Sequence, residues 1–249
     1  MTDFATDLSI PSLFTVAGKA AIVTGGSSGI GTMIASALAA NGAQVTIVGR
    51  KAEALEAVAR DIGCSAFVAD LSKPDEIARL AQEIAGPVDI LVNNAGATWG
   101  APFEDFPTEG FDKVFALNAR TPFLLTQALL PRLAGARIIN ISSVGARMIG
   151  DAPSIAYGPS KAAVEQMTRV MARLLGDRGI TVNCIAPGWF PSRMNAPLGD
   201  AAARDWVAAT PVGRLGTARD IGGLVMFLCS PAGAFMTGQV IDLDGGRSL

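Results

Sequence analysis

The stretch "AAIVTGGSSGIG", Ala20 to Gly31, decides the fold. It begins with a short apolar run, "AAIVT", that has the composition of a buried strand. Four glycines follow within seven residues, and a helical pattern begins directly after them. Glycines permit a tight turn and let the backbone N–H groups of a helix start approach a pyrophosphate. A strand, a glycine turn and a helix in this order predict the first βα unit of a dinucleotide-binding sheet.

The glycine spacing in this turn is Gly-x-x-x-Gly-x-Gly. It differs from the Gly-x-Gly-x-x-Gly of the commonest dinucleotide-binding turn, and no Gly-Lys-Ser/Thr follows that would indicate a nucleoside-triphosphatase loop. A tight glycine turn without a ligand is the alternative interpretation. Because residues 20–49 carry no charged side chain, we expect backbone dipoles to be the local phosphate ligands.

The alternation of strand and helix continues along nearly the whole chain. Short apolar runs recur at 20–24, 44–48, 65–69, 89–92, 137–141, 180–185 and 239–243. Helix-length segments lie at 32–40, 52–62, 75–85, 111–133, 155–175 and 219–228. Nearly continuous apolar strands suit a parallel sheet that is covered on both faces. We therefore predict a single-domain α/β fold, a Rossmann-type doubly wound parallel sheet of seven strands with helices on both faces.

Two segments fall outside this alternation. Residues 1–15 carry acids where a secretory signal would carry bases, so we predict an exposed N-terminal arm before a dinucleotide-binding domain at 16–249. Residues 187–217 are rich in Pro, Gly and Trp and follow the sixth predicted strand. Ligands of such sheets bind beyond the carboxyl ends of the strands. A long irregular segment there is therefore predicted to be a substrate lid.

The bulk composition argues against several classes of protein. A net charge of -2 and a pI near 5.2 give no general attraction to nucleic acid or to an acidic membrane surface. The long uncharged runs 20–49 and 221–241 are interrupted by glycines and polar residues, so we expect no membrane span. The chain has no histidine, and Cys64, Cys184 and Cys229 are widely spaced. We expect buried thiols in the reducing cytoplasm and no metal site.

Charged residues at the end of the second predicted strand bear on the choice of cofactor. A dinucleotide fold that binds NAD typically offers Asp or Glu there for the ribose 2′-hydroxyl. This chain instead has Gly49, followed by Arg50 and Lys51. A guanidinium can bind a 2′-phosphate that a carboxylate would repel, so the pattern favours NADP. The alternative is that these bases merely begin the next helix.

Polar pairs follow the fourth and fifth predicted strands. Asn93 and Asn94 open the motif "NNAG", and paired Asn side chains can join neighbouring loops and approach a ribose. Ser142 and Ser143 follow the fifth strand, where a helix cap or a turn is the alternative interpretation.

Tyr157 is the only tyrosine of the chain, and Lys161 follows it by four residues. On a helix, residues at i and i+4 share one face. A phenol with a pKa of about 10 is poorly matched to acid catalysis at neutral pH. A nearby ammonium favours the phenolate and is expected to lower that pKa. With a serine hydroxyl to hold the substrate oxygen, the pair predicts an acid for the reduction of a ketone.

Taken jointly, these motifs resemble the short-chain dehydrogenase/reductase family over residues 16–249. The resemblance rests on Thr24-Gly25, Gly29-Ile30-Gly31, Asn93 to Gly96, Asn118, Ser143, Tyr157-x-x-x-Lys161, Pro187-Gly188 and "TGQVIDLDGG" (237–246). Within the family, "NNAGATWG", "AYGPSKAA", "APGWFPSRM" and "GAFMTGQVIDLDGG" look most like the NADPH-dependent β-ketoacyl reductases associated with rhamnolipid biosynthesis.

The resemblance implies a role for each catalytic residue. Tyr157 is expected to be the general acid, and Lys161 to lower its pKa and hold the nicotinamide ribose. Ser143 is expected to orient the carbonyl, and Asn118 to support a water-linked proton relay. We choose Ser143 over Ser142 because its 14-residue distance to Tyr157 is nearer the usual gap in the family.

The resemblance also implies a binding site for NADPH or NADP. The expected cofactor-binding residues are Gly25, Ser27, Ser28, Gly29, Ile30, Gly31, Arg50, Lys51, Asp70, Leu71, Asn94, Ala95, Gly96, Tyr157, Lys161, Pro187, Gly188 and Ser192. Ser192 stands where many members have Thr, and it keeps the hydroxyl.

Aromatic and apolar residues predict the substrate side of the site. Trp189, Phe190 and Met194 of the predicted lid, together with Trp99, are expected to line an apolar pocket. The alternative is that these rings pack against the sheet and hold the lid together.

The leading prediction is an NADPH-dependent reductase of a 3-oxoacyl or similarly apolar ketone. The alternatives are an NADP-linked secondary alcohol dehydrogenase and a nucleotide-binding sensor that has lost turnover. The segment 221–229 is apolar on every side, which indicates an interface. Because related reductases are commonly tetramers, we predict a homotetramer. We expect no nucleic-acid or membrane partner.

Overall fold

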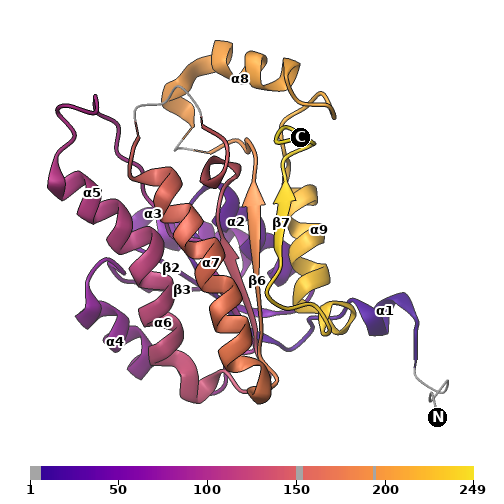
Figure 1. Cartoon of the computed structure of the whole chain (residues 1–249). Helices are drawn as coiled ribbons and strands as arrows, with labels where there is room; N and C mark the ends of the chain where they lie inside the picture. The colour runs from indigo at the N-terminus through magenta and orange to yellow at the C-terminus, as the bar shows by residue number, and fades with distance from the viewer. Residues whose placement is uncertain (1–6, 150–153, 193–194) are drawn as a thin grey trace.

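A sheet of seven parallel strands forms the centre of the molecule (Figure 1). The computed structural model describes residues 7–149, 154–192 and 195–249. The strands are β1 (Ala20–Thr24), β2 (Gln44–Gly49), β3 (Ser65–Val68), β4 (Ile90–Asn93), β5 (Arg137–Ile141), β6 (Thr181–Pro187) and β7 (Val240–Leu243). Their order is β3-β2-β1-β4-β5-β6-β7. The strands β2 and β3 extend the sheet to one side of β1, and β4 to β7 extend it to the other side, so the switch point lies between β1 and β4. This order confirms the predicted doubly wound sheet.

Helices cover both faces of the sheet (Figure 1). One face carries α2 (Gly29–Ala40), α3 (Ala52–Ile62) and α9 (Ala218–Cys229). The other carries α4 (Pro74–Glu83), α5 (Thr108–Phe115), α6 (Thr121–Leu129) and α7 (Tyr157–Leu175). Strand side chains on either face are therefore buried in a hydrophobic core. In β1, Val23 packs towards α2, and Ile22 packs towards α4 and α6. This burial on both sides explains why the strands are apolar at nearly every position.

The helix predicted over 111–133 is divided in the structure. A π-helical turn, Ala116–Arg120, separates α5 from α6, and a 3₁₀ turn, Leu130–Arg132, follows α6. The hydroxyl of Thr121 donates to the carbonyl oxygens of Leu71, at 2.6 Å, and Ala116, at 3.0 Å. Such single wide turns inside helices occur frequently at functional sites, and here the turn carries Asn118.

The predicted lid, 187–217, is less irregular than expected. It contains a 3₁₀ turn, Ala196–Leu198, and a helix, α8 (Gly199–Ala208), which lies beyond the carboxyl ends of β6 and β7 (Figure 1). The helix contains Trp206, whose ring centre lies 5.7 Å from that of Trp189. The alanine-rich sequence of α8 has high helix propensity, a signal that the proline and glycine content around it obscured.

The N-terminal arm holds one short helix, α1 (Ile10–Leu13), and projects from the body (Figure 1). Leu8 and Ile10 are exposed, whereas Val16 is fully buried in the core. Phe14 packs against Phe227 of α9, with ring centres 6.4 Å apart. None of the helices in the described part of the chain combines the length and apolar character that a membrane span needs.

Candidate active site

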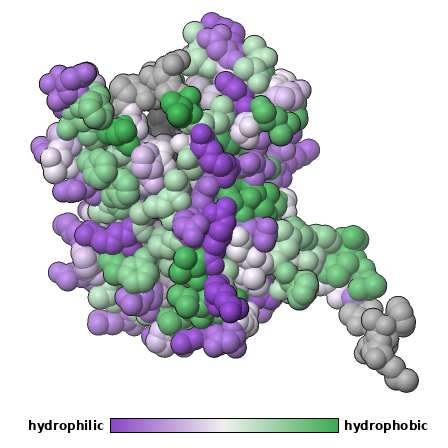
Figure 2. Space-filling model, in the orientation of Figure 1, coloured by the Kyte–Doolittle hydropathy of each residue, from purple (hydrophilic) through white to green (hydrophobic). Residues whose placement is uncertain are grey.

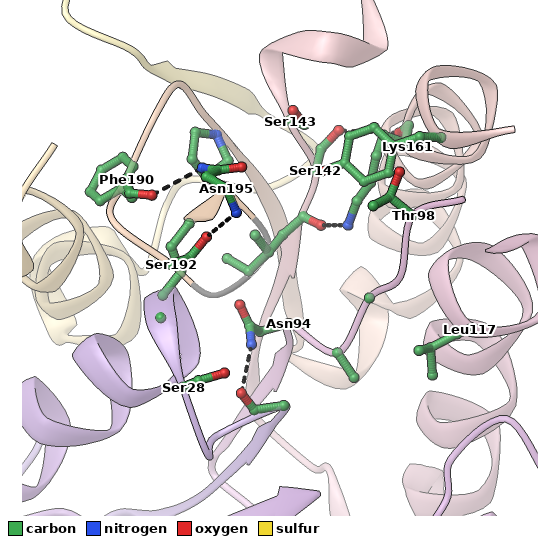
Figure 3. A pocket seen from close by; sticks show the side chains of 18 of the residues that line it. Ser28, Asn94, Thr98, Leu117, Ser142, Ser143, Lys161, Phe190, Ser192 and Asn195 are labelled. Carbon is green, nitrogen blue, oxygen red and sulfur yellow. Dashed lines mark hydrogen bonds between the residues drawn. The ribbon is translucent and has the colours of Figure 1, made fainter. Parts of the chain in front are cut away.

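A cavity of about 610 Å³ lies at the carboxyl ends of the strands, beside α8 (Figure 3). Its size falls in the usual range of small-molecule sites. It collects nearly all the predicted cofactor residues: Gly25, Ser27, Ser28, Gly29, Ile30, Arg50, Lys51, Asp70, Leu71, Asn94, Ala95, Gly96, Tyr157, Lys161, Pro187, Gly188 and Ser192. Residues that are 167 positions apart in the chain thus share one wall because parallel strands end at the same edge of the sheet.

The glycine turn after β1 is built for close approach of backbone. Gly25 and Gly29 have φ values of 67° and 57°, in the left-handed region that favours glycine. A Cβ on Gly31 would lie 2.3 Å from the carbonyl oxygen of Gly25, so Gly31 serves the packing of α2 on the turn and lies outside the cavity wall. The amide nitrogen of Asn94 donates to the carbonyl oxygen of Thr24 at 2.9 Å and to that of Gly25 at 3.3 Å, which fixes the turn to β4. Figure 3 shows the bond to Gly25.

The cavity extends past the end of β2 to Arg50 and Lys51. Asp70 is the single acidic side chain among the described residues that line it. Partial burial raises the pKa of Asp70, but hydrogen bonds from Ser72 and the charges of Arg50 and Lys73 outweigh this and lower it. An uncharged helix start, a glycine turn and two basic side chains fit a phosphorylated dinucleotide.

Tyr157 and Lys161 occupy the first turns of α7 and both line the cavity. The ammonium of Lys161 donates to the carbonyl oxygen of Ile141 at 2.7 Å and lies 5.8 Å from the centre of the Tyr157 ring (Figure 3). Burial lowers the pKa of Lys161 to about 8. Burial also raises the pKa of Tyr157, and the hydrogen bond with Ser143 opposes this rise only in part. Without a bound cofactor, burial therefore raises the pKa of Tyr157, whereas the sequence predicted that this pKa would be lowered.

Ser142 and Ser143 lie in different environments. The hydroxyl of Ser142 is buried, with its acceptors Glu165 Oε1 at 3.0 Å and the carbonyl oxygen of Lys161 at 3.2 Å. Ser143 is half-buried at the cavity wall, and its Oγ accepts a hydrogen bond from the backbone N–H of Gly145 at 3.1 Å. The side chains of Ser143 and Tyr157 both border Gly145, since a Cβ there would lie 3.3 Å from Ser143 Oγ and 3.7 Å from Tyr157 Cε1. The choice of Ser143 over Ser142 as the catalytic serine stays a prediction.

Asn118 is buried behind the cavity wall. Its Oδ1 accepts from the N–H of Ala97 at 2.8 Å, and its Nδ2 donates to the carbonyl oxygen of Ala97 at 3.0 Å and to Ser160 Oγ at 2.9 Å. These bonds join the loop after β4 to α7, so the side chain of Asn118 holds the site together. Its part in a proton relay stays a prediction.

The predicted substrate residues divide into two groups. Trp189 and Phe190 line the cavity. Trp99 does not: its ring packs against Gly110 of α5, and the ammonium of Lys113 lies 5.2 Å from the ring centre. Met194 lies outside the described residues.

Several further residues of the wall were not assigned to the site from the sequence, among them Thr98, Leu117, Ser154 and Asn195. Leu198 and Trp206 of the predicted lid also line the wall. Asn195 stabilises the lid, since its Nδ2 donates to the carbonyl oxygen of Phe190 at 3.1 Å and its N–H donates to Ser192 Oγ at 3.3 Å (Figure 3). Its position three residues after Ser192 was the only sequence signal for it.

Comparison with known proteins places the chain among relatives of nearly equal length. A family model described as enoyl-(acyl carrier protein) reductase matches residues 25–248. A rhamnolipids biosynthesis 3-oxoacyl-[acyl-carrier-protein] reductase of Pseudomonas aeruginosa is 44% identical over 95% of this chain and 98% of its own. A gluconate 5-dehydrogenase of Gluconobacter oxydans is 37% identical over 97% and 99%.

Solved structures agree with this placement. The Pseudomonas aeruginosa RhlG/NADP active-site complex superposes with a TM-score of 0.91 at 44% identity, covering 96% of this chain and 99% of that one. A blue fluorescent protein from a metagenomic library, in complex with NADPH, gives a TM-score of 0.88 at 36% identity, covering 94% and 100%. With its glycine turn, its Tyr-x-x-x-Lys pair and its seven-stranded sheet, the chain belongs to the short-chain dehydrogenase/reductase family.

Proposed function

We propose that this protein is an NADPH-dependent carbonyl reductase that acts on a 3-oxoacyl or similarly apolar ketone. Its relatives include oxidoreductases that act on CH–OH or C=O groups, namely 3-oxoacyl-[acyl-carrier-protein] reductases and a gluconate 5-dehydrogenase. The observation that carries the proposal is one shared cavity. Ser143 after β5 and Tyr157 and Lys161 on α7 line it together with the glycine turn after β1 and Arg50 after β2. A hydride donor and a proton donor can therefore meet over one substrate.

The cavity residues suit NADPH in particular. The turn Gly25 to Ile30 would hold the pyrophosphate with its N–H groups. Arg50 and Lys51 would bind the 2′-phosphate. Asn94 and Lys161 would contact the ribose of the nicotinamide half. Bound NADPH supplies the hydride, and the side chains described next deal with the proton.

Reduction of a ketone places negative charge on its oxygen, and that oxygen must gain a proton. The raised pKa of Tyr157 keeps its hydroxyl protonated at neutral pH, so the proton is present when the reaction needs it. Ser143 donates a hydrogen bond that orients the carbonyl. After transfer, the ammonium of Lys161, held at the carbonyl oxygen of Ile141, stabilises the phenolate that remains.

The proposal is tested by following the absorbance of NADPH with a panel of ketones. The panel should contain 3-oxoacyl thioesters, cyclic ketones and acetone. We expect turnover with the acyl thioesters or with large apolar ketones. Absence of turnover with every ketone, in a protein that binds NADPH, would contradict the proposal and favour a nucleotide-binding sensor.

The reverse reaction is a second candidate. The 37% identity to a gluconate 5-dehydrogenase favours oxidation of a secondary alcohol by NADP. The same cavity serves both directions, because Tyr157 would then accept the proton. Reduction of NADP with secondary alcohols and with gluconate, compared at one pH with the ketone reaction, decides between the two directions.

We propose that the protein is a homotetramer in the cytoplasm. Gly223 of α9 is exposed, Phe227 is only partly buried and Phe235 is fully exposed. The arm that carries α1 adds more apolar surface (Figure 2). Such contiguous patches usually mark interfaces. Sedimentation should give a species of four chains, and a dilute, active species of 25 kDa would contradict the tetramer. The three unpaired cysteines support a reducing compartment.

A further inference from the structure

A buried carboxylate that the proposed reaction does not use lies beside the site. Glu165 is on α7, four residues after Lys161, and is 5% exposed. Its Oε1 accepts a hydrogen bond from Ser142 Oγ at 3.0 Å, and its Oε2 accepts one from Arg147 Nη1 at 2.8 Å. A buried charge is strongly unfavourable unless it is paired and hydrogen-bonded. Glu165 therefore keeps Arg147 against α7.

Arg147 connects this carboxylate to the segment that begins with Ser143. The N–H of Arg147 donates to the carbonyl oxygen of Val144 at 3.0 Å and closes the 3₁₀ turn Val144–Ala146. Its second guanidinium nitrogen, Nη2, bonds to Asp242 of β7. The guanidinium thus spans α7 and β7 while its backbone ends the turn. Ser143 is the first residue of this segment, and it is tied to the rest by the bond from the Gly145 N–H to its Oγ.

We propose that Arg147 and Glu165 are positioning residues, which hold the hydroxyl of Ser143 at the hydroxyl of Tyr157. The inference rests on the proposed function, because it concerns the same reaction. Ser143 and Tyr157 belong to different elements, β5 and its following turn on one side and α7 on the other. The Arg147–Glu165 pair and the Ser142–Glu165 bond join these two elements on either side of Ser143.

The chain offers a direct spectroscopic readout of this positioning. Tyr157 is the only tyrosine, so the ultraviolet absorbance of tyrosinate reports its ionisation alone. The hydroxyl of Ser143, which borders Gly145 together with the Tyr157 ring, lowers the pKa of Tyr157, whereas burial raises it. A displaced Ser143 must therefore raise the titration midpoint. Cys184 on β6 acts electrostatically on Lys161, and Glu165 on α7, which is paired with Arg147, acts on Cys184.

The experiment compares Glu165→Gln, Arg147→Met and the double variant with the wild type. The double variant removes one negative and one positive charge, so the net charge beside the site is unchanged while the loss of positioning remains. Ser143→Ala sets the midpoint for complete loss of the Ser143 hydroxyl. Lys19→Met is the matched control, because it breaks the 3.0 Å Lys19–Asp89 ion pair at the opposite end of the sheet.

We expect kcat to fall about 10- to 100-fold in both single variants and in the double variant, since misplacement by about 1 Å can cost 10²-fold. The tyrosinate midpoint should rise towards that of Ser143→Ala, and NADPH affinity should change less than about threefold. Because Glu165→Gln can fail to fold, Arg147→Lys is the second test. Lysine keeps the positive charge but cannot bond to Glu165 and Asp242 through two nitrogens as the guanidinium does. This variant should show an intermediate kcat and an intermediate tyrosinate midpoint.

Two results would overturn the inference. One is a wild-type midpoint in every folded variant. The other is loss of thermal stability alone, as expected for Lys19→Met. Failure of the proposed function is distinguishable, because a wild-type protein that turns over no ketone or alcohol still reports the Tyr157 midpoint in each variant.

Discussion

Gly216 and the ring of Phe190 occupy one tightly shared space. A Cβ on Gly216 would lie 2.4 Å from Cζ of the ring, and the ring itself is 2% exposed. The N–H of Gly216 also donates to the carbonyl oxygen of Trp189 at 3.0 Å. The two ends of the lid are thus fixed to each other beside the cavity, and Phe190 has no room to move towards residue 216.

Gly216→Ala should therefore displace Phe190. We expect a loss of about 1–3 kcal/mol in the free energy of unfolding, the usual effect of overpacking. The KM for ketone should rise, while NADPH affinity should change little. Gly176→Ala is the matched control, because the space around Gly176 at the end of α7 is open and its backbone is helical, which alanine favours. Equal stability of the two variants in denaturant would show that Phe190 adapts freely.

Tyr157→Phe should abolish most of the activity and leave the fold intact. The substitution keeps the ring and removes the hydroxyl that we assign as the proton donor. General acid assistance typically contributes about 10²- to 10⁴-fold to the rate. Turnover at saturating ketone and NADPH binding should be measured together. Wild-type turnover in this variant would mean that another group donates the proton.

Lys161 should make the stability of the cofactor-free protein depend on pH. Its pKa is about 8 in the fold and 10.5 as an ordinary lysine. Between these values the unfolded chain binds one more proton at this residue than the folded protein, so stability increases as pH rises. Below pH 8 the full cost of burying the charge remains, on the order of 3 kcal/mol.

Lys161→Met removes this dependence and provides the measurement. The difference in unfolding free energy, wild type minus Lys161→Met, should increase between about pH 8 and pH 10. The difference is used because two buried thiols have the opposite effect on stability. Burial raises the pKa of Cys184 and of Cys229 to about 12, so these thiols lower the stability as pH rises above 9. A constant difference over this range would show that Lys161 titrates as an exposed lysine.

The sequence predicted the sheet and most of the cavity because both depend on local signals. The apolar runs fixed the strands, and the parallel order then brought Gly25, Arg50, Asn94, Tyr157 and Gly188 to one edge. Long-range packing was not predictable in the same way. Trp99 lies in the loop after β4, as expected. Its ring, however, packs in the space beside Gly110 of α5 and not in the cavity.

The pKa of Tyr157 shows the same limit. The spacing of Tyr157 and Lys161 correctly predicted a shared helix face. It could not reveal that both side chains are buried, or that the ammonium of Lys161 is engaged by the carbonyl oxygen of Ile141. Burial is a property of the whole fold, and here it is the main cause that raises the pKa of Tyr157. The π-helical turn at Asn118 was also hidden, because it depends on a bond from Thr121 to Leu71, 50 residues away.

Cofactor preference should follow Arg50. We expect NADPH to bind more tightly than NADH, because the guanidinium attracts the 2′-phosphate and the end of β2 carries Gly49 in place of an acid. Gly49→Asp combined with Arg50→Ala should shift the preference towards NADH. A Cβ at position 49 would lie 3.2 Å from Leu55 Cδ1, so the aspartate needs a small adjustment of α3. Arg50→Ala alone separates the loss of the guanidinium from the effect of the aspartate at position 49. Titration of both cofactors checks this, and equal or tighter NADH binding by the wild type would refute it.

Catalytic efficiency should increase with the size of the ketone. Trp189, Phe190 and Trp206 line the cavity on the side of the lid. Each methylene buried against them contributes roughly 0.8 kcal/mol, or about fourfold in kcat/KM. Acetone should be a poor substrate, and a ladder of ketones of increasing acyl length measures the slope. Trp206→Ala should flatten the slope, since it removes apolar wall. Trp99→Ala is the matched control, because Trp99 packs on α5 outside the cavity and its loss should leave the slope unchanged. A flat ladder in the wild type would show that the lid rings stabilise the lid without contacting substrate.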